Sequence, residues 1–282
     1  MNSFTEISGS LSKLEKSEIV VLPVPYDGTS TWRKGADKGP FAILDASQAL
    51  ELYDIETDYE VYKKGIHTCS MLEVSSLVEG VVGQVKAKVR KLLSLDKFVV
   101  TLGGEHSISV GAVKAYREKY KDLCVLQLDA HADLRDEYMG SRYNHACTAA
   151  RIKEICPIVQ AGIRSMSVEE SSILDLERVI MFDDIQRGNN WMDRMTEMLS
   201  DRVYVTIDLD VLDSAIMPST GTPEPGGFDW RQITGLLKAI SEKKNVVGFD
   251  VVELCPSKDN KAPDFTAAKL IYKFLSYIYS RR

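Results

Sequence analysis

The chain has 282 residues, of which 44% are hydrophobic and 27% are charged, and its formal net charge is −6. This composition is typical of a folded globular protein with a large core, and the lack of a basic tract argues against a nucleic-acid partner. No apolar run approaches the length of a membrane span, so we expect no membrane contact. The five scattered cysteines form no CxxC pair and the first residues form no apolar signal segment, so we expect a cytoplasmic protein.

Apolar runs typical of buried strands alternate with segments of helical spacing along the chain. The predicted strands span residues 18–24, 59–62, 97–102, 123–128, 157–161, 179–182, 202–207 and 246–254. The predicted helices span residues 41–53, 74–95, 108–120, 144–155, 168–176, 190–199, 229–242 and 262–279. Continuous apolar strands that alternate with helices predict an α/β protein whose parallel sheet is covered by helices on both faces. No repeat or linker breaks the pattern, so we expect one domain over residues 1–282.

Three of the predicted strands end in side chains that can bind metal ions. The segments that follow these strands are Gly103-Gly104-Glu105-His106, Asp129-Ala130-His131-Ala132-Asp133 and Asp208-Leu209-Asp210. In an extended chain, side chains two residues apart point to the same face, so the members of each segment could converge. Sites in parallel sheets form at the carboxyl ends of the strands, where all three segments fall.

Together the three segments offer six oxygen and nitrogen ligands: His106, Asp129, His131, Asp133, Asp208 and Asp210. Six ligands exceed the need of one tetrahedral ion and suit two divalent ions about 3.5–4 Å apart, which share bridging carboxylates. Two such ions would neutralise the four aspartates. Each segment alone could be an ordinary turn or a capped strand-to-helix connection. Because two of only four histidines fall in these segments, we favour the metal centre.

Two further residues are candidates for catalysis. His145 lies in a loop-to-helix stretch and could be an ordinary cap residue or a proton shuttle, since imidazole titrates near neutrality. Glu253 lies in the apolar run 246–254, where a carboxylate needs a partner. That partner could be a local arginine or lysine, or a guanidinium held by two parallel hydrogen bonds. His67 has no such context and is expected to be structural or exposed.

The motifs GGEHS (103–107), DAHAD (129–133), DLDVLD (208–213), GTPEPGG (221–227) and DVVEL (250–254) occur in the order found in the arginase–agmatinase (ureohydrolase) family. The segment GTSTWRKGADKGP (28–40) is similar to the N-terminal segment of that family, so the chain resembles it over nearly its whole length. The resemblance implies a three-layer α/β/α fold with a mainly parallel central sheet. It also implies two Mn²⁺ ions per subunit and a homo-oligomer, either a trimer or a hexamer.

The resemblance assigns a role to each candidate residue. One ion would be held by His106, Asp129, Asp133 and Asp208, and the other by Asp129, His131, Asp208 and Asp210. A hydroxide that bridges the ions would attack a guanidinium carbon and release urea and an amine. The catalytic residues would be Asp133, together with Glu253, which grips the guanidinium, and His145, which transfers a proton or contacts the substrate. Here His145 is followed by Ala-Cys, where many members have His-Gly.

The expected substrate is a small cationic guanidine. The loop 134–142 lacks the Asn-rich pattern by which arginases hold an amino acid, and its Asp136 and Glu137 could suit an amine. The GTPEPGG form and the stretch around His145 resemble agmatinases. We therefore expect agmatine to be hydrolysed to putrescine and urea, a step of polyamine biosynthesis.

Other substrates and other classes of protein stay open. Arg135 and Arg142 could bind a carboxylate, so arginase, guanidinobutyrase, formimidoylglutamase and aminopropylagmatine ureohydrolase are alternatives within the family. A different two-metal hydrolase, such as a deacylase, and a catalytically silent metal-binding protein are alternatives from other classes. Release of urea from a guanidine separates the first group from these two.

Overall fold

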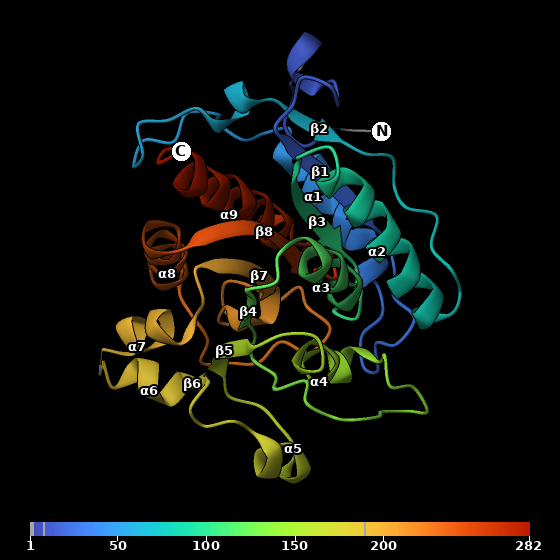
Figure 1. Ribbon diagram of the computed structural model, residues 1–282, viewed down its shortest axis with the longest axis vertical. Coiled ribbons are helices and arrows are strands. Elements are labelled where there is room, and N and C mark those ends of the chain that lie inside the picture. Colours follow the sequence, from blue (N-terminus) through green and yellow to red (C-terminus); the bar gives the residue numbers. More distant parts are fainter. Residues whose placement is uncertain (1–2, 8, 189) are drawn as a thin grey trace.

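The computed structural model describes residues 3–7, 9–188 and 190–282. Its strands form one parallel sheet in the order β2-β1-β3-β8-β7-β4-β5-β6, which Figure 1 shows from top to bottom. The strands are β1 (Ile19–Val24), β2 (Ile66–Thr68), β3 (Phe98–Gly103), β4 (Leu123–Leu128), β5 (Ile158–Ile163), β6 (Val179–Met181), β7 (Arg202–Asp208) and β8 (Asn245–Val252). The strands in the middle of the sheet are buried along nearly their whole length, because helices cover both faces.

The helices form two layers. They are α1 (Gly39–Ser47), α2 (Val78–Leu93), α3 (Ile108–Lys119), α4 (Thr148–Lys153), α5 (Val168–Ile173), α6 (Phe182–Gln186), α7 (Trp191–Met198), α8 (Trp230–Lys243) and α9 (Ala262–Tyr279). One face of the sheet carries α1 and α6 to α9, and the other carries α2, α3 and α4 (Figure 1). Alternate residues of β1 supply both layers, since Ile19 and Val21 face the first and Val20 and Leu22 the second.

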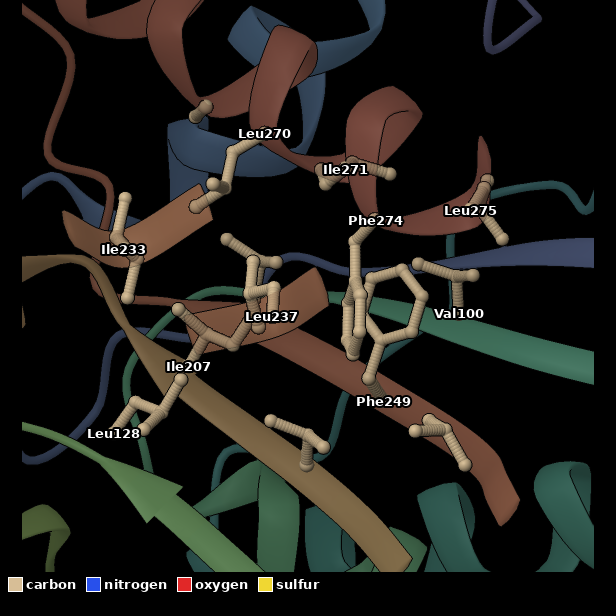
Figure 2. Packing of buried hydrophobic residues seen from close by; sticks show 14 of the residues in the cluster. Val100, Leu128, Ile207, Ile233, Leu237, Phe249, Leu270, Ile271, Phe274 and Leu275 are labelled. Carbon is tan, nitrogen blue, oxygen red and sulfur yellow. The ribbon is translucent and has the colours of Figure 1, made fainter. Parts of the chain in front are cut away.

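The larger core lies between α8, α9 and the middle of the sheet. Figure 2 shows Phe274 of α9 against Phe249 of β8, with ring centroids 4.7 Å apart, and Leu237 of α8 beside Ile207 of β7. These side chains are buried and well packed, so the central strands are held rigidly. A rigid centre is what a precise site at the ends of these strands requires.

The predicted α/β class and three-layer arrangement are confirmed, and α9 has the predicted bounds. The predicted strand at 59–62 is wrong. A 3₁₀ turn occupies Val61–Lys64, and the edge strand is Ile66–Thr68, which pairs with β1. The helix predicted for 41–53 ends at Ser47, and α6 was not predicted. All five cysteines are free and buried. None of the helices in the described part of the chain combines the length and apolarity that a membrane span needs.

Candidate active site

The candidate site lies where four neighbouring strands end. His106 follows β3, Glu253 follows β8, Asp208 ends β7 and Asp129 follows β4. These four strands are adjacent in the sheet, so residues distant in sequence meet at one edge. His106, Asp208 and Glu253 line a pocket of about 280 Å³, and Asp129 is fully buried. Its further lining comes from the segments that follow β1, β4, β5 and β7, and includes Trp32, Arg33, Arg135, Tyr138, His145, Ser165, Glu170 and Thr222.

His106 is the centre of the first group of ligands. Its Nδ1 lies 3.2 Å from Oδ2 of Asp129, 3.3 Å from Oδ2 of Asp133 and 3.3 Å from Oδ2 of Asp208. Donors bound side by side to one octahedral ion at about 2.1 Å are about 3 Å apart, so this spacing suits a divalent cation. The Nδ1 atom is buried and has no hydrogen-bond partner among the described residues. An ion would satisfy this atom, and the residues present therefore fit the implied metal.

His131 belongs to a second group with Asp129 and Asp210, whose ligand atoms lie within 4.8 Å of one another. Its Nδ1 is 2.8 Å from Oδ2 of Asp210 and 3.8 Å from Oδ1 of Asp129. Asp129 thus turns one oxygen to each histidine, as a bridging carboxylate would. Asp208 joins the first group, and its place in the second stays a prediction.

The chain around the ligands fixes their orientation. Oδ1 of Asp129 accepts a hydrogen bond from the backbone N–H of His131 at 2.6 Å, and Oδ2 accepts one from Nε2–H of Gln127 at 2.7 Å. The remaining oxygens of Asp210 and Asp208 accept backbone N–H groups at 3.0 and 2.9 Å. Asp133 reaches the site from a left-handed backbone conformation with φ of 52°. The predicted extended geometry therefore does not persist to Asp133, yet its carboxylate converges on His106.

The crowding of buried charges perturbs the ligands strongly. Burial and the neighbouring Asp129 raise the pKa of Asp133 to about 7. Burial opposes protonation of His131, but Asp210, Asp129 and Asp133 raise its pKa to about 11. Burial, Asp210 and Asp129 raise the pKa of Asp208 well above its ordinary value. Without a cation, Asp133, His131 and Asp208 hold their protons more tightly than usual, whereas the pKa of Asp210 is lowered by its contact with His131.

His145 sits beside this cluster, with its Nδ1 at 3.0 Å from the Thr29 hydroxyl and its backbone N–H on the same oxygen at 2.9 Å. Burial and the nearby His106 and His131 lower the pKa of His145 to about 4, so its imidazole is neutral at pH 7. Thr29 also donates a hydrogen bond to Glu105, which is fully buried, and so fixes the loop after β1 to the end of β3.

The same loop lies close to Gly104. Glycine is required at position 104, because a Cβ would lie 1.8 Å from the Tyr26 carbonyl oxygen.

Glu253 lies one residue beyond β8, in a left-handed conformation with φ of 66°. Its Oε1 accepts the backbone N–H of His106 at 2.7 Å, and the side chain lines the pocket. Among the described residues, no arginine or lysine forms an ion pair with Glu253, so the alternative of a structural salt bridge is wrong. Burial and the carboxylates of Asp208 and Glu105 raise the pKa of Glu253 well above its ordinary value. A cationic group in the pocket would find here a preorganised carboxylate.

The loop after β4 differs from its predicted role. Asp136 does not line the pocket but pairs with Arg142 at 2.7 Å and with Arg151 on α4. Its proposed contact with a substrate amine is therefore wrong, as is that of Arg142 with a carboxylate. Arg135 does line the pocket, stacked over the Tyr138 ring at 4.5 Å.

Glu170, on the short helix α5, was not predicted to be near the site. It accepts backbone N–H groups from Leu134 and Ser167, each at 2.9 Å, and so joins two walls of the pocket. Gln127, Thr206 and Asp250 were also missed. A polar residue within each apolar run was the available signal.

Eight parallel strands between two helical layers, with paired histidines and aspartates at the strand ends, define an α/β protein with a candidate centre for divalent ions. The chain belongs to the arginase family, whose family model matches residues 17–276. The predicted family is thereby confirmed, as is the prediction of an agmatinase-type hydrolase that acts on C–N bonds of linear amidines.

Individual relatives cover nearly the whole chain. N(1)-aminopropylagmatine ureohydrolase of Thermus thermophilus is 40% identical over 262 residues, which are 92% of this chain and 89% of that protein. Agmatinase of Pyrococcus horikoshii is 32% identical over 272 residues, 92% of this chain and 91% of that protein. The crystal structure of agmatine ureohydrolase of Thermoplasma volcanium matches with a TM-score of 0.88 at 34% identity, and the match covers 99% of this chain and 95% of that one.

Proposed function

We propose that the chain binds two Mn²⁺ ions and hydrolyses the guanidinium group of agmatine to urea and putrescine. The observation that carries the proposal is the buried, unpartnered Nδ1 of His106, which faces three carboxylate oxygens at 3.2–3.3 Å. His106, Asp129, Asp133 and Asp208 would hold one ion, and Asp129, His131, Asp208 and Asp210 the other. When bound, such ions supply a water that is activated for attack near neutral pH.

The chain's own groups would bind and orient the substrate. With Oε1 of Glu253 fixed by the His106 N–H, the carboxylate offers a charged acceptor for the guanidinium at the base of the pocket. His145 is held at Nδ1 by Thr29, which leaves Nε2 for proton transfer to or from the reacting group. Once two ions neutralise the four aspartates, the carboxylate of Glu253 would remain in the pocket lining to attract a cation.

N(1)-aminopropylagmatine is a second candidate substrate. The relative from Thermus thermophilus, at 40% identity, carries the name of an aminopropylagmatine ureohydrolase, as does one from Synechocystis at 34%. Both candidate substrates present the same guanidinium and butyl chain to the metal centre. They differ only in the aminopropyl extension at the other end, so the same catalytic residues would serve either one.

The test incubates Mn²⁺-loaded protein with agmatine, N(1)-aminopropylagmatine, arginine and guanidinobutyrate, which would release urea, and with formimidoylglutamate, which would release formamide. We expect the highest kcat/KM with agmatine, loss of urea release after chelation, and recovery with Mn²⁺. A higher kcat/KM with aminopropylagmatine would make the second candidate the function. A metal-loaded protein that releases urea from neither agmatine nor N(1)-aminopropylagmatine would refute both.

A further inference from the structure

A chain of buried hydrogen bonds leads from the back of His106 into the centre of the sheet. Nε2 of His106 lies 2.9 Å from Oγ1 of Thr206 on β7. The Thr206 hydroxyl donates to Oδ1 of Asp250 on β8 at 2.6 Å, and the Tyr204 hydroxyl donates to Oδ2 of Asp250 at 2.7 Å. All four side chains are fully or almost fully buried.

The sheet itself builds this chain. Thr206 and Asp250 are direct partners in the register of β7 and β8, so their side chains lie together on one face. Tyr204 is two residues before Thr206 and therefore points to the same face. His106, on the loop after β3, reaches back over this face from the neighbouring strand end.

Asp250 is a fully buried acid, which is unusual for a residue whose only role is structural. A carboxylate with no exposure in a central strand destabilises a fold unless it has partners, and the described residues that contact the Asp250 carboxylate are Thr206 and Tyr204 rather than an arginine or lysine. Its hydrogen bonds come from neutral hydroxyl groups. An apolar residue would pack at this position at lower energetic cost, so the acid points to a role beyond packing.

The directions of the hydrogen bonds between Asp250, Thr206 and His106 indicate what that role is. Thr206 has one hydroxyl proton, and Asp250 at 2.6 Å is a closer acceptor than the Ser109 hydroxyl at 3.3 Å. The Thr206 oxygen is then free to accept a hydrogen bond from Nε2–H of His106. With its proton on Nε2, the imidazole keeps the lone pair of Nδ1, which faces Asp129, Asp133 and Asp208.

We propose that Asp250 is a positioning residue for the metal centre, which acts through Thr206 to hold His106 in the tautomer and orientation that bind an ion at Nδ1. The inference rests on the metal-binding part of the proposed function. Partners behind a metal-binding histidine fix its ring and raise its basicity, and their loss typically lowers metal affinity 10- to 100-fold. Asp250 touches neither the ligand oxygens nor the substrate pocket, so its effect runs through His106 alone.

The experiment compares Mn²⁺ affinity, measured by competition with a chelator, in four variants of the full chain. Thr206→Val removes the hydroxyl that links Asp250 to His106, and Thr206→Ser restores it. Asp250→Asn removes the charge. Thr101→Val is the matched control, because Thr101 is equally buried and faces Asp250 from β3, but its hydroxyl makes no hydrogen bond to Asp250, Thr206 or His106.

We expect one Mn²⁺ ion to bind about 10- to 100-fold more weakly in Thr206→Val and in Asp250→Asn, with wild-type affinity in Thr206→Ser and Thr101→Val. Wild-type affinity in Thr206→Val would overturn the inference. An equal loss in Thr101→Val would overturn it too, because the effect would then come from packing. A metal-loaded wild type that releases no urea would refute the proposed function alone, since the affinity comparison does not depend on turnover.

Discussion

Asp129 occupies the point where the two groups of ligands meet, and its substitution tests the bridge. In Asp129→Asn, the amide nitrogen cannot act as an anionic ligand, so one of the two groups loses a donor. We expect metal content and urea release to fall together, with activity lowered at least about 100-fold. Metal analysis after gel filtration, with activity on the same sample, measures both.

The control for Asp129→Asn is Asp136→Asn, which makes the same change in an exposed side chain outside the pocket. This control should keep its metal. Full occupancy and a normal rate in Asp129→Asn would contradict the bridging role.

Glu253 should separate substrate binding from metal binding. In Glu253→Gln, the side-chain oxygen can still accept the His106 N–H, so the ligands keep their places, but the charge that attracts a guanidinium is lost. A hydrogen bond to a charged group contributes about 1.5–3 kcal/mol, so we expect kcat/KM to fall about 10- to 100-fold with metal retained. Steady-state kinetics and metal analysis of one sample give the answer, and Glu154→Gln, outside the pocket, is the control.

For single residues, the sequence predicted the candidate metal ligands better than the residues that hydrogen-bond to them. Two of the four histidines, and aspartates spaced by two, fall at strand ends, so their convergence could be predicted. Gln127 and Thr206 are ordinary polar residues, and only the register of the strands shows that they hold Asp129 and His106. Asp136 was misjudged because sequence proximity to a motif does not say which way a loop side chain points.

At the scale of elements, α9 is attached to the long segment after α1 by a buried ion pair. Nζ of Lys273 lies 3.0 Å from Asp54 and 2.7 Å from Glu56, and the Tyr277 hydroxyl donates to Glu56 at 2.7 Å. Burial raises the pKa of both acids, but hydrogen bonds and the charge of Lys273 outweigh it, so the pKa of Glu56 falls to about 2 and that of Asp54 also falls. This contact joins residues some 220 positions apart.

Lys273→Met should therefore destabilise the protein by about 3 kcal/mol, because Asp54 stays buried without its cation. The acids have native pKa values below their unfolded values, so the ion pair stabilises the fold fully above about pH 5 and less as the pH falls toward about 2. Denaturant unfolding at both ends of this range should show a shrinking difference from wild type. Lys238→Met, which removes an exposed partner of Glu56, should lower stability by less than about 1 kcal/mol at any pH.

A helix or strand could be predicted from the sequence when local residues determine it, but not when distant contacts do. Strands such as β4 and helix α9 are long, apolar and regular, so their sequences specify them. The edge strand β2 has only three residues and exists because it pairs with β1, whereas the aromatic stretch at 59–62 has strand propensity but lies in turns.

For the whole molecule, the family resemblance predicts a trimer or a hexamer of the 31.5 kDa chain. Light scattering coupled to gel filtration would measure a mass three or six times that of the chain. A monomer at micromolar concentration would contradict the prediction. The single domain expected over residues 1–282 predicts one cooperative unfolding transition in the same preparation.

The metal centre should also set how the stability of the whole protein depends on pH. In the metal-free protein, burial and Asp129 raise the pKa of Asp133 from 3.8 to about 7. Burial lowers the pKa of His131, but the charge of Asp210 raises it by more, so the pKa of His131 rises from 6.5 to about 11. Groups with raised native pKa values keep their protons in the native state after the unfolded chain has lost them. The contribution of these two groups to the stability of the metal-free protein therefore falls as the pH rises from about 4 through neutrality.

Bound Mn²⁺ would reverse this dependence, because the ion would take the place of the protons and bind deprotonated ligands. We expect Tm of the chelator-treated protein to fall from about pH 5 to about pH 8, and the increase in Tm on adding Mn²⁺ to grow over the same range. One ion at 100 times its Kd contributes about 2.7 kcal/mol, which corresponds to several degrees. Calorimetry at the two pH values measures Tm of the chelator-treated protein and the increase in Tm on adding Mn²⁺. The control is Asp129→Asn, whose Tm should increase little with Mn²⁺. An increase that shrinks with pH would mean that protons and Mn²⁺ do not compete for these side chains.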